Sequence, residues 1–194
     1  MAKVNKISIF TNSILQTNIS DPTLDKKILQ ILKKEEKKKE KVIRSNKGGF
    51  HSSSIKDKKI IQTFLKKAGD TISSSYKFQN NTTINLQNLW IIKNKKNHWN
   101  MPHTHPNTNF SGVYYVKVPK KGGELIFIRN DATCGFSHNY NFINNTDTHD
   151  FCTFKPEQGL LLIFPSYFLH MVAPHNENED RVSVSFNVVF THDN

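Results

Sequence analysis

The chain has 194 residues, which is enough for one domain with a sizeable core but too few for two large domains. Hydrophobic residues make up 36% of the chain and charged residues 22%, a balance typical of a soluble globular protein. No run approaches the roughly 20 apolar residues of a membrane span, so a membrane protein is excluded.

The basic charge of the chain only weakly indicates a polyanionic partner. Lys and Arg number 27 against 16 acidic residues, which gives a formal net charge of +11. Such a balance can mark a nucleic-acid-binding protein. Only Arg44, Arg129 and Arg181 are arginines, however, and arginine supplies most bidentate contacts to bases and phosphates. The chain is also rich in Asn and Ile, as expected for a protein from an AT-rich genome.

The termini and cysteines indicate a reducing compartment. The polar start, Met1–Lys6, leads into no apolar segment of the signal-peptide type. The two cysteines, Cys134 and Cys152, form no CxxC pair. We therefore expect neither export nor a disulfide framework nor a cysteine-based zinc site.

The first part of the chain predicts a short strand followed by a helix. Ile7–Phe10 alternates between apolar and polar residues, as a strand does. Asp21 is a suitable helix cap, and Pro22 suits the first helical position. The apolar face of this helix follows the helical period and comprises Leu24, Ile28, Leu29, Ile31 and Leu32.

A charged run and a turn separate this helix from a second one. Lys33–Lys41 is almost wholly Lys and Glu and predicts a solvated helix end or loop, with a polyanion-binding tail as the alternative. The turn-rich segment Ser45–Phe50 leads to a helix over about Lys56–Ser74. The residues expected to face inward on this helix are Ile60, Ile61, Phe64, Leu65 and Ala68.

From Tyr76 the apolar period changes from 3.6 to 2. Short strands without intervening helices predict a mainly β fold, an antiparallel sandwich or jelly roll. We expect residues 76–194 to form this β core, and residues 1–75 to form a helical layer packed on one of its sheets. We expect these two parts to form a single domain. Asp131–Lys155 lacks periodicity and predicts a loop long enough to serve as a lid. The predicted strands are Thr82–Lys93, Gly112–Val118, Glu124–Arg129, Gly159–Phe164, His170–Val172 and Arg181–Phe190.

Three histidines form a candidate metal site. On a strand, His103 and His105 would point to the same face, because residues i and i+2 share a face. His170 follows a later apolar strand, and distant strands of a jelly roll meet across its interior. Three neutral imidazoles on one side of a metal leave coordination positions open opposite them. The alternative is that these histidines are surface residues or hydrogen-bonded core residues. The other histidines show no such spacing: His51, His98, His138, His149, His175 and His192.

A candidate carboxylate receptor lies eleven residues after His170. Arg181 and Ser183 share a strand face, and a guanidinium beside a hydroxyl suits a carboxylate. Tyr115, on the strand after the histidine pair, could donate to the same carboxylate. The alternatives are a surface salt bridge of Arg181 with Asp180 or Glu179, and a core aromatic role for Tyr115.

Together these segments resemble the 2-oxoglutarate/Fe(II)-dependent oxygenases, and most closely a group of small members found in bacteria and tailed phages. The resemblance covers nearly the whole chain, since the group also carries the Ser-Asn-x-Gly-Gly-aromatic segment and a Trp before the histidine pair, here Trp90. The segments that carry it are Ser45–Phe50, Pro102–Pro106, Ser111–Val116, Gly122–Leu125, Phe164–Ser166, His170–Val172 and Arg181–Asn187.

The resemblance implies a double-stranded β-helix that binds Fe(II) and 2-oxoglutarate and uses O₂. It implies metal ligation by His103 and His170, and binding of the 2-oxoglutarate carboxylate by Arg181 with help from Ser183 and Tyr115. The wider superfamily has an acidic residue where this chain has His105. We expect His105 to be the second ligand. The alternatives are Asp131, Glu124, or a water or small anion.

The implied activity is a hydroxylase that couples oxidative decarboxylation of 2-oxoglutarate to oxidation of an unknown substrate. We expect a small molecule or a peptidyl side chain rather than a nucleic acid, in the cytoplasm of a bacterial or phage-infected cell. A homodimer formed through a sheet edge is compatible with the fold. Two other functions remain open: a three-His cupin-type dioxygenase without 2-oxoglutarate, for which Arg181 and Ser183 have no evident use, and a non-catalytic metal-binding jelly roll.

Overall fold

A computed structural model of the protein describes residues 12–38, 42–129 and 151–192. These residues form a mainly β structure with two helices, as predicted. The helices are α1 (Pro22–Glu35) and α2 (Lys58–Ser73). The strands are β1 (Leu15–Asn18), β2 (Asn46–Lys47), β3 (Phe50–His51), β4 (Thr82–Asn94), β5 (Trp99–His103), β6 (Phe110–Lys117), β7 (Leu125–Ile128), β8 (Phe151–Phe154), β9 (Leu160–Pro165), β10 (His170–Val172) and β11 (Arg181–His192).

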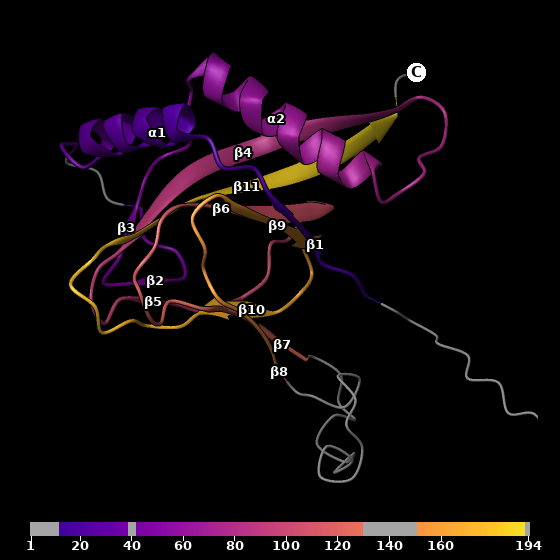
Figure 1. Ribbon diagram of the computed structural model, residues 1–194. Coiled ribbons are helices and arrows are strands. Elements are labelled where there is room, and N and C mark those ends of the chain that lie inside the picture. The colour runs from indigo at the N-terminus through magenta and orange to yellow at the C-terminus, as the bar shows by residue number, and fades with distance from the viewer. Residues whose placement is uncertain (1–11, 39–41, 130–150, 193–194) are drawn as a thin grey trace, which may run out of the picture.

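The strands form two antiparallel sheets that face each other. The six-stranded sheet has the order β1-β9-β6-β11-β4-β3, and the five-stranded sheet has the order β2-β5-β10-β7-β8. Figure 1 shows the larger sheet above the smaller one. From β4 to β11 the chain alternates between the sheets, except that β7 and β8 are neighbours in the smaller one. This interleaving is the jelly-roll arrangement expected from the sequence.

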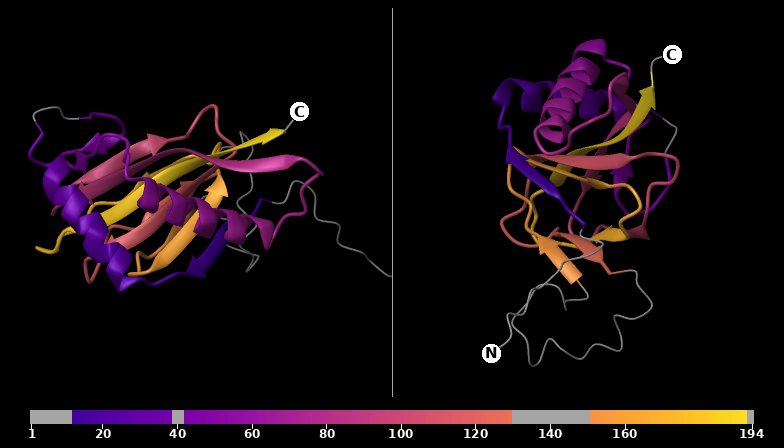
Figure 2. Two further views of the ribbon diagram at one scale, coloured as in Figure 1. Left: turned by 90° about the horizontal axis from the view of Figure 1, so that it is seen from above. Right: turned by 90° about the vertical axis from the view of Figure 1, so that its right-hand side faces the viewer.

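Both helices cover the outer face of the larger sheet, on the side away from the smaller sheet (Figures 1 and 2). α1 begins where predicted, because the Asp21 side chain accepts hydrogen bonds from the backbone N–H groups of Thr23 and Leu24. Asp57 caps α2 in the same way. The main hydrophobic core lies between the helices and this face. It contains Leu24, Ile28, Leu32, Ile60, Phe64, Ala68 and Ile72 from the helices and Leu89, Ile91, Tyr114, Val116, Leu161, Ile163, Val184, Phe186 and Val188 from the sheet.

A smaller hydrophobic cluster lies between the two sheets. It contains Val113, Tyr115, Leu160, Leu162 and Phe164 from the larger sheet and Leu125, Phe127 and Val172 from the smaller one. Strand alternation separates the two cores, since Tyr114 and Tyr115 are neighbours on β6 but belong to different clusters. The inter-sheet cluster leaves part of the inner face free for a cavity.

Three details differ from the sequence-based expectations. The predicted loop over Asp131–Lys155 includes β8, which pairs with β7. The rest of the loop up to residue 150 lies outside the described part of the chain. The predicted strand Ile7–Phe10 also lies outside it. The short edge strands β1, β2 and β3 were not predicted, because such strands depend on their partners more than on their own pattern. His103 ends β5, so His105 lies beyond the strand on which both were expected. Neither described helix is long and apolar enough to cross a membrane.

Candidate metal centre

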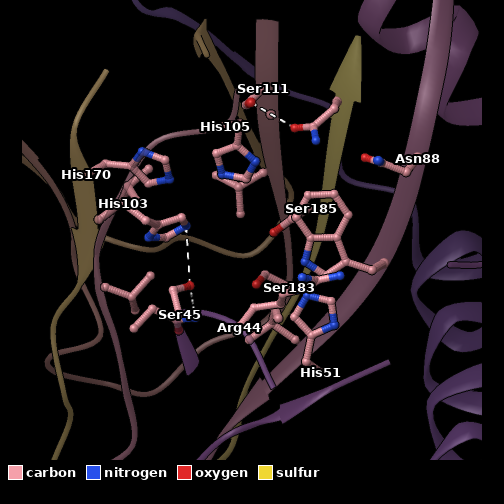
Figure 3. Close-up of a pocket in the computed structure, with 18 of the residues that line it drawn as sticks. Arg44, Ser45, His51, Asn88, His103, His105, Ser111, His170, Ser183 and Ser185 are labelled. Atoms are coloured by element: carbon pink, nitrogen blue, oxygen red, sulfur yellow. Dashed lines mark hydrogen bonds between the residues drawn. The ribbon is translucent and has the colours of Figure 1, made fainter. Parts of the chain in front are cut away.

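A cavity of about 770 Å³ lies between the sheets and brings together five of the six predicted site residues. His103, His105 and His170 line it from the side of the smaller sheet, and Arg181 and Ser183 line it from β11. Tyr115 belongs to the inter-sheet cluster, where its ring lies beside Arg181. Figure 3 shows the three histidines on one side of the cavity, facing the serines of β11.

The three histidines form one compact group. Each offers one ligand nitrogen, and these nitrogens lie within 4.8 Å of one another. His103 and His170 are direct neighbours across the β5–β10 pair, with ring centroids 4.4 Å apart. The His105 ring lies 5.1 Å from that of His103 and 5.2 Å from that of His170. A backbone hydrogen bond from His105 N to Ser166 O, 2.9 Å long, holds the segment beyond β5 in place.

Backbone carbonyls fix the tautomers of two of these histidines. His103 Nδ1 lies 2.7 Å from Met101 O, and His170 Nδ1 lies 2.8 Å from Phe168 O. A carbonyl oxygen can only accept, so each Nδ1 carries the proton. In the neutral ring, Nε2 then carries a lone pair, as metal ligation requires.

Burial keeps the histidines neutral. Burial, with a smaller contribution from the neighbouring His103, lowers the pKa of His105 to about 4 and that of His170 to about 3. Burial also lowers the pKa of His103, against the effect of its hydrogen bond to Met101. At neutral pH the cluster therefore presents uncharged imidazoles, the form that binds Fe(II).

Of the two acidic residues considered as alternative second ligands, only Glu124 is described, and it does not join this cluster. Glu124 is absent from both the histidine group and the cavity lining. Asp131 lies outside the described residues. The donor set among the described residues is three imidazole nitrogens, and it fits a divalent transition metal.

Arg181 is almost fully buried, with 1% of its surface exposed. Its Nε donates to Gly123 O over 3.0 Å, and Nη1 donates to Ser183 Oγ over 3.0 Å. No Asp or Glu within the described ranges forms an ion pair with it. The expected alternative of a surface salt bridge with Asp180 or Glu179 is therefore wrong for the described structure. A buried guanidinium without a carboxylate partner is costly unless an anion binds there.

Tyr115 lies against this guanidinium. Arg181 Cζ is 4.9 Å from the centre of the Tyr115 ring. The Tyr115 hydroxyl is buried and has no hydrogen-bond partner among the described residues. Burial raises the pKa of Tyr115, while the Arg181 cation acts in the opposite direction. The hydroxyl therefore stays protonated as an unused donor beside the unpaired cation.

The cavity also contains residues that sequence reasoning did not assign to it. His51, from β3, stacks on Trp90 with ring centroids 5.6 Å apart, and Trp90 stacks on His105 at 5.8 Å. Ser45 Oγ lies 3.4 Å from His103 Nε2. His51 had no informative spacing, because β3 reaches the cavity only by pairing with β4. Trp90 was indicated only by the family resemblance.

Solved structures share this fold at low sequence identity. The viral collagen prolyl hydroxylase of Paramecium Bursaria Chlorella virus-1, in its 2-oxoglutarate complex, aligns with a TM-score of 0.60 and 12% identity over 90% of this chain and 94% of that chain. A Pseudomonas putida prolyl-4-hydroxylase aligns with a TM-score of 0.60 and 12% identity, over 92% of this chain and 94% of that chain. HygX from Streptomyces hygroscopicus, with nickel and 2-oxoglutarate bound, aligns with a TM-score of 0.60 and 9% identity, over 92% of this chain and 83% of that chain.

The sequence comparison identifies the family. No curated protein matches the chain. The sequence model of the family described as "Putative 2OG-Fe(II) oxygenase" matches residues 88–187, just over half of the chain and the part that contains all six predicted site residues. The chain therefore belongs to the 2OG-Fe(II) oxygenases, enzymes that use Fe(II), 2-oxoglutarate and O₂.

Proposed function

We propose that the protein is a hydroxylase that couples oxidative decarboxylation of 2-oxoglutarate to oxidation of a substrate C–H bond. In this proposal His103, His105 and His170 hold Fe(II), and Arg181, Ser183 and Tyr115 hold the distal carboxylate of 2-oxoglutarate. The observation that carries it is the buried Arg181, which lies on the same cavity as the histidine cluster and lacks a carboxylate partner among the described residues.

The histidines supply neutral ligands in fixed orientations. The carbonyls of Met101 and Phe168 hold two of the rings with Nε2 free of a proton. Iron and 2-oxoglutarate, when bound, supply the activation of O₂. Because three imidazoles leave the +2 charge of the ion uncompensated, the protein favours a dianionic co-substrate beside it.

Arg181 and its neighbours orient the co-substrate. Two of its N–H groups are used by Gly123 and Ser183, which fix the guanidinium plane and leave the other N–H groups for a carboxylate. Tyr115 adds a hydroxyl donor that has no other described partner. Burial strengthens these charge-assisted hydrogen bonds, because the local dielectric constant is low.

Aromatic side chains form part of the cavity wall beside the reacting groups. His51 and Trp90 form a stacked aromatic wall beside His105. We propose that the Ser45–Phe50 segment covers the metal side, because Ser45 lines the cavity close to His103. A closed, dry site protects an oxidising centre from side reactions.

The test is an anaerobic titration of the Fe(II)-loaded protein with 2-oxoglutarate. Binding is monitored through the weak visible metal-to-ligand charge-transfer band of the complex. We expect a saturable band for the wild type and an affinity about 100-fold lower for Arg181→Ala, which removes the partner of a buried anion. For His105→Ala we expect the band to shift or vanish while the protein stays folded.

Arg44→Ala is the matched control. Arg44 also lines the cavity, but it is exposed and not part of the Arg181 pocket, so we expect less than a threefold change. A wild-type protein that binds Fe(II) but shows no band with 2-oxoglutarate would contradict the proposal. Equal effects of the two arginine substitutions would contradict the role given to Arg181.

A further inference from the structure

The inner face of β11 continues as a polar stripe beyond the part assigned to 2-oxoglutarate. Arg181, Ser183, Ser185 and Asn187 follow one another at intervals of two residues, and all line the cavity. The first two belong to the proposed carboxylate receptor. The far end of the stripe has no role in that proposal, although Asn187 is only 8% exposed.

Three strands bring polar side chains together at this far end. Asn187 pairs with Asn88 on β4 and with Ser111 on β6. The register of the β4–β11 pair shifts between Asn187 and Val188, because Val188 pairs with Leu86 and leaves Gln87 as an extra residue. Before this bulge Leu86 packs on the helix side, and after it Asn88 faces the cavity. The bulge therefore sets which β4 side chain reaches the site.

The hydrogen bonds leave an acceptor and a donor unused in this row. Ser111 Oγ donates to Asn187 Oδ1 over 2.8 Å. The Asn187 side chain also hydrogen-bonds to His105, in the sense that raises the His105 pKa, so its oxygen is the acceptor there too. The amide N–H groups of Asn187 are therefore available as donors. Asn88 Oδ1 is buried and has no partner among the described residues. Figure 3 shows the Ser111 hydrogen bond and the Asn88 side chain extending from β4 toward the cavity. A neighbouring donor and acceptor are complementary to an amide, whose C=O accepts and whose N–H donates.

The charges around the cavity disfavour a cation, and the unused Asn88 oxygen disfavours an anion at the far end of the stripe. Among the described residues, no Asp or Glu lines the cavity, whereas Arg44 and Arg181 both line it. An ammonium group would find no counter-charge here. A carboxylate would face the Asn88 oxygen, which repels it because both are acceptors. An uncharged amide satisfies both unused groups without a buried charge.

We propose that the row formed by Asn88, Ser111 and Asn187, here called the amide row, is a substrate subsite that binds an uncharged amide, such as a carboxamide. This inference rests on the proposed function, because it assigns the amide to the substrate of the same site. The amide row lies at the opposite end of the β11 stripe from Arg181, so the two ends bind different molecules. The bound amide belongs either to a free small molecule or to a carboxamide side chain of a peptide.

The experiment compares isosteric probes on the protein loaded with Fe(II) and saturated with 2-oxoglutarate, without oxygen. Saturation blocks the Arg181 pocket, so that acids cannot bind there. Propionamide, propionate and propylammonium are titrated, and line broadening of their proton NMR signals gives the affinities. A second set consists of N-acetyl-asparagine methylamide and its aspartate counterpart. We expect the amide of at least one set to bind about tenfold or more tightly than its charged counterparts, and the set that binds more tightly identifies the source.

Variants locate the effect in the amide row. Asn88→Leu should lower the amide affinity about tenfold. Asn88→Asp, which keeps the shape of the side chain, should transfer the preference to propylammonium. Asn85→Leu is the matched control, because Asn85 lies on the same strand, outside the cavity lining, where it donates to Thr191 Oγ1. It should leave all affinities unchanged.

Equal binding of the amide and charged probes in both sets would overturn the inference, as would an unchanged amide affinity in both Asn88 variants. The 2-oxoglutarate titration is run first on the same samples. Failure to bind 2-oxoglutarate would overturn the proposed function. Normal 2-oxoglutarate binding without an amide preference would overturn the amide row alone.

Discussion

The two faces of β11 are both buried but differ in chemistry. The outer face carries Val182, Val184, Phe186 and Val188, none more than 2% exposed, packed in the main core beneath the helices. The inner face carries Arg181, Ser183, Ser185 and Asn187 around the cavity. Burial alone therefore does not separate structural residues from functional ones in this protein. The difference lies in the polarity of the buried side chains, and in the hydrogen-bonding capacity that the inner face leaves unused.

Two adjacent tyrosines of β6 repeat this contrast. Tyr114 faces the helices, and its hydroxyl donates to Asp25 Oδ1 over 2.7 Å, while Gln158 donates to the other oxygen of the same carboxylate. Tyr115 faces the opposite way, and its hydroxyl has no described partner. The helix side satisfies its polar groups internally, whereas the cavity side leaves them for a ligand.

The largest expected effect is on the outer face. Phe186→Ala should lower the free energy of unfolding by about 3–5 kcal/mol, because the ring is fully buried and packs on Phe64 and against Gly112. Ser185→Ala, the next residue on the inner face, should change it by less than about 0.5 kcal/mol. Urea denaturation of the metal-free protein measures both. Similar losses for the two variants would break the comparison of the two faces.

The second effect concerns the cavity histidines and pH. The folded-state pKa values of His105 and His170 lie below the ordinary value, so the folded protein binds fewer protons than the unfolded chain. The contribution of the two neutral histidines to the free energy of unfolding is fully present above about pH 6.5 and is lost as the pH falls toward 4. We expect the metal-free protein to lose on the order of 2 kcal/mol between pH 6.5 and 5. Thermal unfolding across this range measures the loss.

A variant that replaces both of these histidines with Asn supplies the control for the pH effect. Its stability should depend less on pH over the same range, because the two depressed groups are absent. An identical pH dependence in the variant and the wild type would show that other groups dominate acid unfolding.

The tyrosine pair gives a smaller and sharper comparison. Tyr114→Phe should cost about 1–2 kcal/mol, because it removes a hydrogen bond to a buried carboxylate. Tyr115→Phe should leave stability unchanged within about 0.5 kcal/mol, since the lost hydroxyl has no described partner, but it should weaken 2-oxoglutarate binding severalfold. Denaturation curves and 2-oxoglutarate titrations of both variants separate the two outcomes. Equal destabilisation would contradict the assignment of the Tyr115 hydroxyl to a ligand.

The smallest effect is a gain. Arg181→Leu removes a buried cation that lacks a described carboxylate partner, so we expect stability without ligand to rise by about 1 kcal/mol. The same variant should lose the stabilisation that 2-oxoglutarate gives the wild type. A thermal-shift series with and without 2-oxoglutarate measures both changes. A marked loss of stability without ligand would instead give Arg181 a structural role.

The sequence predicted the parts of the fold that depend on local pattern. Asp21 and Pro22 marked the start of α1, and the change of period at Tyr76 marked the start of the β region. β4 and β11 were predicted nearly to their ends, because long strands with a period of two carry a strong signal even though a bulge interrupts β4. β2 and β3 were missed, because two-residue strands exist only through pairing with β5 and β4.

The site was predicted in its chemistry but not in its full composition. His103, His105, His170 and the Arg181–Ser183 pair were recognisable from residue type, spacing and family resemblance, and the structure brings them to one cavity. The position of His105 beyond β5 was not predictable, since a backbone contact with the distant Ser166 holds it.

Sequence alone therefore determined the class of fold, the candidate metal-binding side chains and the family, because each depends on periodicity or on short motifs. Only the tertiary structure decided which polar residues share the cavity. Asn88, Ser111 and Asn187 come from three strands, and a single bulge at Gln87 sets the face to which Asn88 points. No local pattern records such a juxtaposition, because it arises from strand pairing and register between distant parts of the chain.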